Sequence, residues 1–207
     1  LDLPFLFKKP ELYEAMTAAY KRGDVSFIIP PKPFLGAKGA LALLRNDTGN
    51  PGVEAITKAF IRSRSLELVR GYIPETVLVG KRAASNDEAK RRVAEKRHVL
   101  KESISSGMKG TVFSDEDGFA TTLERAGQSY MSWILQEEVA NQPQRFSWFV
   151  NGEGNEPRIE TADDWFMRVT VHYVNRKLAD VIVTARRDKA VHGGKDCLQL
   201  GTRVLCT

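Results

Sequence analysis

The chain has 207 residues, of which 42% are hydrophobic and 28% are charged, a balance typical of a globular protein with a buried core. No apolar run approaches the roughly 18 residues of a membrane-spanning helix, and the first residues lack a signal-peptide pattern. Cys197 and Cys206 are too few for a disulfide framework, which favours a cytoplasmic location. The net charge of +5 suits anionic partners, but scattered surface lysines and arginines would give the same value.

The first part of the chain is predicted to be mainly helical. Apolar spacing, prolines and glycines predict, in order, a helix from Pro10 that Gly23 ends, a buried strand at 25–29, a helix at 38–45, and a loop at 46–52. A long helix is expected after this loop, with Val53, Ile56 and Phe60 on its inner face.

A second group of elements follows residue 73. Ser85 and Glu88 have the spacing of a capping box and predict a charged helix that runs to about Lys96. The pattern then predicts a strand at 98–101, a helix at 119–131 with Leu123, Ala126 and Tyr130 inward, and a strand at 133–136.

The hydrophobic period changes to two in the last third of the chain. Strands are predicted at 145–150, 166–174 and 180–186, with a hairpin turn at 175–177. Interleaved helices and strands followed by a strand-rich part favour an α+β fold with an antiparallel sheet.

The segment after the strand at 98–101 has features of a phosphate-binding loop. Lys101 ends this strand, and a loop of small residues carries Gly107, Lys109 and Gly110. Glycines allow a backbone to approach a ligand closely and to turn its N–H groups toward an anion. Two lysines beside such a loop predict a site for a polyphosphate, although a solvated strand end followed by an ordinary turn would look the same.

The strand at 133–136 continues into a second candidate region. Gln136, Glu137, Glu138 and Val139 form an apolar strand end followed by acids, an edge on which an adenine could bind by backbone hydrogen bonds. The two glutamates could equally be polar residues that end a strand.

Two arginines on later strands are candidate phosphate ligands. Arg168 lies on the polar face of the strand at 166–174, and Arg186 ends the next strand. Guanidinium groups bind phosphate oxygens through paired, charge-assisted hydrogen bonds. A solvated sheet face would show the same pattern.

His192 precedes two glycines and is expected to be either a turn residue or a substrate contact. His192 and Cys197 alone do not make a zinc site, because structural zinc takes four ligands.

Taken in order, these motifs resemble the ATP-grasp superfamily, which includes glutathione synthetase and D-alanine–D-alanine ligase. The resemblance extends from about Pro31 to Gly194. Its motifs are a helix that follows Leu35-Gly36-Ala37-Lys38, the segment Tyr72-Ile73-Pro74-Glu75-Thr76, the strand His98-Val99-Leu100-Lys101, the loop Ser105 to Gly110, the segment Ile134 to Val139, the strand pair around Arg168 and Arg186, and the turn His192-Gly193-Gly194.

The resemblance implies two α/β lobes with antiparallel sheets around a nucleotide cleft, with ATP and Mg²⁺ as cofactors. Lys101, Ser105, Gly107 and Lys109 would contact phosphates, residues 136–139 the adenosine, and Arg168 and Arg186 the transferred γ-phosphate. The expected division is an N-terminal segment at 1–72, a small lobe at 73–138 and a strand-rich lobe at 139–207. The implied activity is ligation of an unidentified carboxylate to an amine through an acyl phosphate.

One departure from the family pattern leaves alternatives open. Family members usually hold magnesium with an acid and then a Glu-x-Asn pair after the turn, and no such pair follows Gly194; Asp188 and Asp196 match poorly. The resemblance would then imply a truncated member, a permuted member or a degenerate domain that binds without catalysis. A basic nucleic-acid-binding domain is a further alternative, supported only by the charge, because the chain lacks interleaved aromatic and basic residues.

Overall fold

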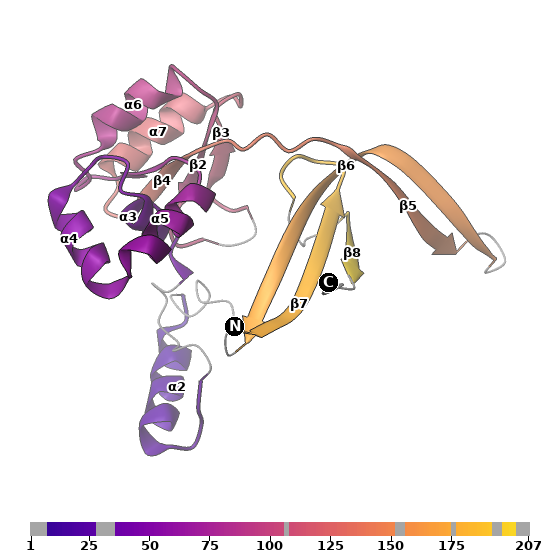
Figure 1. Cartoon of the computed structure of the whole chain (residues 1–207), viewed down its shortest axis with the longest axis horizontal. Coiled ribbons are helices and arrows are strands. Elements are labelled where there is room, and N and C mark those ends of the chain that lie inside the picture. The colour runs from indigo at the N-terminus through magenta and orange to yellow at the C-terminus, as the bar shows by residue number, and fades with distance from the viewer. Residues whose placement is uncertain are drawn as a thin grey trace. The chain divides into compact units, whose positions relative to one another are not determined.

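The structure is a computed structural model that describes residues 8–27, 36–105, 108–151, 156–174, 177–191 and 196–201. Two compact units divide the chain, residues 1–139 and 140–207, and each is considered by itself. The described helices are α2 (Pro10–Arg22), α3 (Gly39–Arg45), α4 (Pro51–Phe60), α5 (Ser63–Tyr72), α6 (Asn86–Val93) and α7 (Phe119–Gln128) (Figure 1). None of them is long and apolar enough to cross a membrane.

A four-stranded antiparallel sheet forms the centre of the first unit. Its strands lie in the order β1-β4-β2-β3, with bounds β1 (Thr76–Val79), β4 (Trp133–Glu137), β2 (His98–Glu102) and β3 (Thr111–Phe113). Helices α6 and α7 lie side by side against this sheet in Figure 1. Strand and helix side chains meet in one hydrophobic core of Val77, Val79, Ala89, Leu100, Phe119, Leu123, Ala126 and Leu135.

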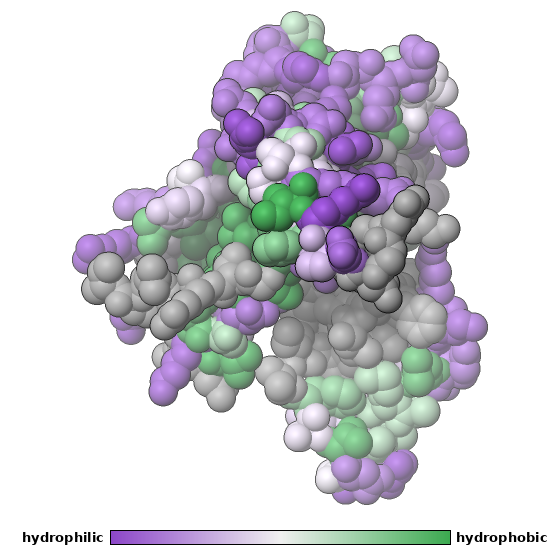
Figure 2. Space-filling model, turned by 90° about the vertical axis from the view of Figure 1, so that its right-hand side faces the viewer, coloured by the Kyte–Doolittle hydropathy of each residue, from purple (hydrophilic) through white to green (hydrophobic). Residues whose placement is uncertain are grey.

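The second unit contains a four-stranded antiparallel sheet in sequential order. Its strands are β5 (Gln144–Asn151), β6 (Pro157–Val174), β7 (Lys177–Arg186) and β8 (Cys197–Gly201). Alternate apolar side chains of these strands remain solvent-exposed, among them Phe149, Ile159 and Tyr173. Figure 2 views the molecule from the side on which Figure 1 draws β5, and hydrophobic surface lies there beside hydrophilic surface. The predicted α+β fold with antiparallel sheets is confirmed; the nucleotide cleft and the boundary at residue 72 remain predictions.

Several predicted elements are confirmed. Helix α2 begins at Pro10 and ends at Gly23, which adopts a left-handed φ of 82°. Strands β2, β4, β5, β6 and β7 lie where the apolar patterns predicted strands, and Lys177 is the first residue of β7. Residues 175–176 of the predicted turn, like residues 28–29 of the predicted early strand, lie outside the described part of the chain.

Other predictions are wrong. Residues 25–27 form no strand, and Val25 is exposed. The long helix after residue 52 is two helices, α4 and α5, and Ile56 and Phe60 point to solvent rather than inward, with Phe60 86% exposed. The periodicity correctly identified an apolar stripe on α4. Other helices cover the sheet, so this stripe does not pack against it and remains exposed.

Two helix ends also differ from the prediction. Ser85 precedes α6 but makes no capping bond, because its hydroxyl donates to the Leu78 carbonyl instead, and the helix ends at Val93 rather than near Lys96. Helix α7 ends at Gln128, so Tyr130 lies beyond it and is exposed, while Leu123 and Ala126 are buried as predicted.

An ion pair joins helices α4 and α5. The Arg70 guanidinium donates to both Glu54 oxygens, at 3.1 and 2.5 Å. These hydrogen bonds, followed by those from Asn46 and Lys58, lower the pKa of Glu54 to about 2. The pKa of Glu54 in the folded state therefore lies below its unfolded value of about 4.3. The ion pair between Glu54 and Arg70 stabilises the fold fully above about pH 4.3, and this stabilisation is lost as the pH falls toward 2.

We therefore expect Glu54→Gln to lower the free energy of unfolding at neutral pH and to lose this difference from the parent as the pH approaches 2. Urea denaturation of the variant and the parent at a series of pH values measures this difference in unfolding free energy. Glu124→Gln on α7 is the control, because Glu124 is exposed and no ion pair is found for it among the described residues. A difference that stays constant between pH 6 and about 2 would contradict the role of this pair.

Candidate functional site

Lys101 lies on the sheet face opposite the hydrophobic core of the first unit. Leu100 faces that core, and alternation along β2 places Lys101 on the other face, which it shares with Gln136 of β4. The Lys101 amine donates to the Gln136 side-chain oxygen Oε1 at 2.7 Å. Its partner is therefore a neutral amide, and two of the three ammonium protons have no partner among the described residues.

A chain of hydrogen bonds fixes Gln136 in this orientation. Its amide nitrogen donates to the Thr76 hydroxyl at 2.9 Å, and that hydroxyl donates to the Pro74 carbonyl at 2.7 Å. Gln136 and Thr76 are both buried. Each donor in the chain has a defined acceptor, so the Gln136 oxygen remains directed at Lys101. Gln136 thus supports Lys101, and its predicted contact with a cofactor remains a prediction.

A second lysine, Lys38, which belongs to the motif Leu35-Gly36-Ala37-Lys38 but was not predicted as a ligand, lies beside this group. Lys38 precedes α3, and its amine donates to the Ser105 carbonyl at 2.6 Å, the Ser105 hydroxyl at 3.0 Å and the Glu102 carbonyl at 3.4 Å. Backbone bonds hold this segment, since the Lys38 N–H donates to the Ser103 carbonyl and the Gly39 N–H to the Ser103 hydroxyl, both at 2.9 Å. In the sequence, only the motif Leu35-Gly36-Ala37-Lys38 distinguishes Lys38, and that motif predicted a helix and not a ligand.

Both amines have lowered pKa values. Burial lowers the pKa of Lys101, and the positive charge of Lys38 lowers it further. Burial also lowers the pKa of Lys38, and the Glu102 carboxylate only partly opposes this. Neither amine forms an ion pair with a carboxylate among the described residues. Two half-buried cations without a paired carboxylate among the described residues make this place a candidate anion-binding site, because a bound anion would supply the missing countercharge.

The loop between β2 and β3 forms part of this site. Ser105 contacts Lys38, as described above, whereas Lys109 is exposed. Gly110 has a φ of +66°, and a Cβ there would lie 2.8 Å from the Glu102 Cβ. The close approach that requires this glycine is therefore to β2. Gly107 lies outside the described residues.

The acids at the end of β4 are held by basic residues of the same unit. Glu137 pairs with Lys96 at 3.1 Å, and Glu138 pairs with Arg97 at 3.4 Å. The backbone N–H of Glu137 donates to the Glu75 carbonyl and that of Glu138 to the Arg97 carbonyl. Val139 follows, exposed, with no backbone partner among the described residues.

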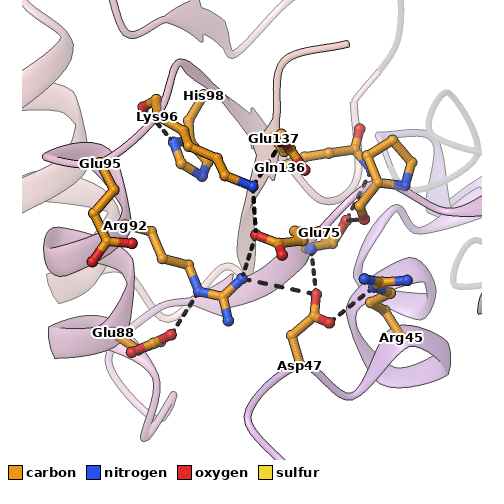
Figure 3. A network of polar contacts seen from close by, with 12 residues as sticks. Arg45, Asp47, Glu75, Glu88, Arg92, Glu95, Lys96, His98, Gln136 and Glu137 are labelled. Atoms are coloured by element: carbon orange, nitrogen blue, oxygen red, sulfur yellow. Dashed lines mark hydrogen bonds and ion pairs between the residues drawn. The ribbon is translucent and has the colours of Figure 1, made fainter.

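Figure 3 shows the polar network that surrounds this strand end. Arg92 of α6 contacts Glu88 at 2.6 Å, Glu75 at 3.3 Å and Asp47 at 4.0 Å, and Lys96 joins Glu75 to Glu137. Asp47 in turn accepts the Thr76 N–H at 2.7 Å. The network ties α6, the loop before α4 and the ends of β1 and β4 together, so it positions the acids of β4.

In the second unit, Arg168 and Arg186 share one face of the β6–β7 pair. Phe166 lies opposite Arg186, and Arg168 lies opposite Thr184. The two guanidinium groups donate to neighbouring carbonyls, Arg168 to Val191 at 3.3 Å and Arg186 to Ala190 at 3.4 Å. His192, the predicted substrate contact, lies just outside the described residues.

Arg186 also lines a cavity of about 430 Å³ in this unit. The other lining residues are Trp165, Arg187, Asp188, Asp196, Cys197 and Leu198. Within the described part of the chain, no group of three His, Cys, Asp or Glu side chains could hold a metal ion.

We expect Gln136→Glu to weaken binding of an anion at Lys101. A carboxylate in this position would pair with the Lys101 amine, compete with the ligand and raise the pKa of that amine. Isothermal titration with inorganic tripolyphosphate should show a loss of about tenfold or more, or about 1.4 kcal/mol. Gln128→Glu at the end of α7 is the matched control, and equal losses in both variants would show a general charge effect.

Comparisons with known proteins give little support for any relationship. No family model matches the chain, and no curated protein matches it. Among solved structures, the chain is similar to D-alanyl-alanine synthetase A from Vibrio cholerae O1 biovar eltor str. N16961, with 15% sequence identity and a TM-score of 0.29. The similar region covers 52% of this chain and 32% of the synthetase chain. Similarity of this degree establishes neither a common fold nor a common activity.

Proposed function

We propose that this chain is the ATP-binding part of a ligase of the ATP-grasp type. The observation that carries the proposal is the pair of neighbouring half-buried amines, Lys101 and Lys38, for which no carboxylate partner is found among the described residues. Lys38 also contacts Ser105 of the loop of small residues. A polyphosphate supplies several negative oxygens at once and would neutralise both. The motif order described above supports ATP as the source of that polyphosphate.

The adenosine would bind at the end of β4. The Val139 N–H has no partner among the residues that the structure describes and could donate to a ring nitrogen, as adenine recognition by a backbone edge requires. Glu137 and Glu138 are held in place by Lys96 and Arg97, so that either carboxylate could accept a ribose hydroxyl. Ser105 and Lys109 would complete the phosphate contacts from the loop.

In the proposed reaction, a carboxylate oxygen of the substrate attacks the γ-phosphorus of ATP, and the bond from that phosphorus to the bridging oxygen breaks. The products are an acyl phosphate and ADP, and an amine then displaces phosphate from the acyl carbon. Lys101 and Lys38 would hold charge that develops on the phosphates. The carboxylate substrate is unidentified, and no step is assigned to Mg²⁺, for which the described residues offer no site.

A thermal-shift titration tests nucleotide binding. At about 100 times the dissociation constant, ATP should stabilise the protein by roughly 2.7 kcal/mol. Titrations with ATP, ADP and tripolyphosphate, each with and without Mg²⁺, separate recognition of the phosphates from recognition of adenosine. The absence of a shift with all three ligands in folded protein would overturn the proposal.

A domain that binds ATP without catalysis is the second candidate, since the pair of amines that carries the proposal supports binding of a polyphosphate and not a chemical step. ADP release in the presence of mixed carboxylates and amines distinguishes the two. Release above the rate of a Lys101→Met variant would support the ligase, whereas ATP binding without release would support the binding domain. Nucleic-acid binding that weakens steeply with salt would instead support the basic-domain alternative.

A further inference from the structure

Strand β5 (Gln144–Asn151) forms one edge of the sheet in the second unit, because its ladder is to β6 alone among the described strands. In an antiparallel pair, the N–H and C=O groups of alternate residues point away from the neighbouring strand. Among the described residues, no hydrogen bond outside the ladder to β6 is found for the β5 backbone. The outward-directed groups of β5 can therefore pair with a further strand.

The edge of β1 in the first unit is blocked by side chains, whereas no such block is found at β5 in the part of the chain that the structure describes. At β1, the Asp47 carboxylate accepts the Thr76 N–H, and the Ser85 hydroxyl donates to the Leu78 carbonyl. Side chains of this kind, prolines and lysines at an exposed edge commonly prevent pairing with other chains. Strand β5 contains neither proline nor lysine. It therefore lacks the usual features that oppose pairing.

The residues of β5 favour a paired strand. Aromatic side chains lie on both of its faces, Phe146 and Trp148 on one and Phe149 on the other. Phe149 is 77% exposed, and Arg145 is the one charged residue of the strand. An exposed edge strand of β-prone, apolar residues with little charge is the kind that pairs with another chain.

An irregularity in the β5–β6 ladder leaves β5 itself regular. Gln144 pairs with Trp165 and Phe146 with Ala162, so two residues of β6 lie opposite one residue of β5. The extra residue of this bulge therefore belongs to β6. From Phe146 to Asn151 the register continues without a shift. A regular strand presents its outer groups at the constant spacing that a second strand requires.

The sequence of β5 matches itself in antiparallel order. Opposite residues of an antiparallel pair lie on the same face, so a two-fold axis that relates two copies of β5 must pass beside one residue and its copy. With the axis at Ser147, Phe146 lies opposite Trp148 of the partner subunit, and Arg145 lies opposite Phe149 of the partner subunit. Aromatic pairs and an arginine over an aromatic ring both stabilise paired strands. Symmetry provides each contact twice, and the small Ser147 side chain fits beside its own copy.

We propose that β5 is an interface with a second copy of this chain, whose own β5 pairs with it in antiparallel register about Ser147. The two sheets then form one continuous sheet across the two-fold axis. A second copy supplies the same unpaired backbone groups and a matching side chain at each position, which an unrelated strand does not. Because both copies use the same edge, the contact closes on itself and yields a dimer. The interface does not depend on nucleotide binding.

Sedimentation equilibrium of the full chain tests this interface. One chain has a mass of 23.1 kDa, and we expect the weight-average mass to rise toward twice that value as the protein concentration increases. A short strand edge buries less surface than a standard interface, so the concentration series extends to about 1 mM. A mass that stays at that of one chain throughout the series would overturn the proposal.

Ser147→Lys tests the position of the axis. It places two ammonium groups directly opposite each other and should raise the dissociation constant of the dimer at least tenfold. Thr161→Lys is the matched control, because Thr161 of β6 lies opposite Ser147 and the two hydroxyls share a hydrogen bond of 2.8 Å. Both residues are exposed and both variants lose this bond, but only Ser147→Lys changes the edge. Equal dissociation constants of the two variants would overturn the proposal.

A mixture of charge variants provides a second measurement. Ser147→Glu should also weaken the dimer, but an equimolar mixture with Ser147→Lys should restore association, because opposite charges then face each other at the axis. Circular dichroism reports whether each variant is folded. Failure of the folded variants to associate in the mixture would overturn the proposal.

If either charge variant does not fold, oxidation of Ser147→Cys decides, with Cys197 and Cys206 replaced by serine. The proposed register brings the two Cα atoms at position 147 within the range of a disulfide, so a covalent dimer should form. Thr161→Cys in the same background should remain monomeric. No covalent dimer of Ser147→Cys, or equal amounts from both variants, would overturn the proposal.

Discussion

Replacing Lys101 with methionine should remove most of the stabilisation, roughly 2.7 kcal/mol, that the parent protein gains from ATP at about 100 times its dissociation constant. Methionine keeps the length and apolar stem of lysine but has no charge. The Lys101 amine is half-buried and is repelled by Lys38, and within the described part of the chain its one hydrogen-bond partner is the neutral Gln136 amide. It therefore gains more from a bound anion than a solvated lysine would.

Without nucleotide, the same variant should be as stable as the parent or more stable. A buried charge without a paired anion carries a desolvation cost, and removal of that charge relieves it. This combination of lost ligand response and retained stability distinguishes a binding lysine from a structural one. Thermal unfolding with and without ATP measures both quantities.

Lys90→Met is the matched control, because Lys90 is an exposed lysine of α6. We expect it to retain the full response to ATP. An unchanged response in Lys101→Met would exclude Lys101 from the nucleotide site, and a loss of stability in the absence of ATP would assign it a structural role.

Replacing Leu100 with alanine should lower the free energy of unfolding of the first unit by about 2–5 kcal/mol. Leu100 is completely buried in the core between the sheet and helices α6 and α7. The shorter side chain loses its transfer free energy and leaves a cavity that close-packed neighbours fill only in part. This loss is a large fraction of the stability of a typical domain.

Urea denaturation followed by circular dichroism measures this effect. Leu68→Ala on α5 is the control, because Leu68 is 63% exposed, and it should change the unfolding free energy by no more than about 0.5 kcal/mol. Similar effects of the two substitutions would contradict the assignment of the core to this face of the sheet.

The local signals in the sequence were sufficient for many elements. Pro10 and Gly23 mark the ends of α2 because the first fits the start of a helix and the second adopts a left-handed φ that ends it. Period-two alternation predicted β6 and β7 because side chains alternate between sheet faces whatever lies on each face. Such features depend on neighbouring residues and can be read from a short segment.

Elsewhere, contacts between segments that are distant in the sequence determined the structure, and local patterns predicted it incorrectly. The capping-box spacing at Ser85 is correct, yet its hydroxyl bonds to Leu78 across the edge of β1. The stripe on α4 has the right period, yet Ile56 and Phe60 are exposed. A periodic pattern shows that a helix has an apolar face, but it does not show whether another element covers that face.

The sequence alone determined the α+β class, most strands and the position of Lys101 at the end of a strand after a short apolar run. Only the tertiary structure paired Lys101 with Gln136, and only it brought Lys38 to the same loop, since Lys38 and Glu102 are 64 positions apart. The physical reason is that burial and electrostatic repulsion act through space. Whether a lysine is solvated or lacks a countercharge is decided by chain folding and not by its sequence neighbours.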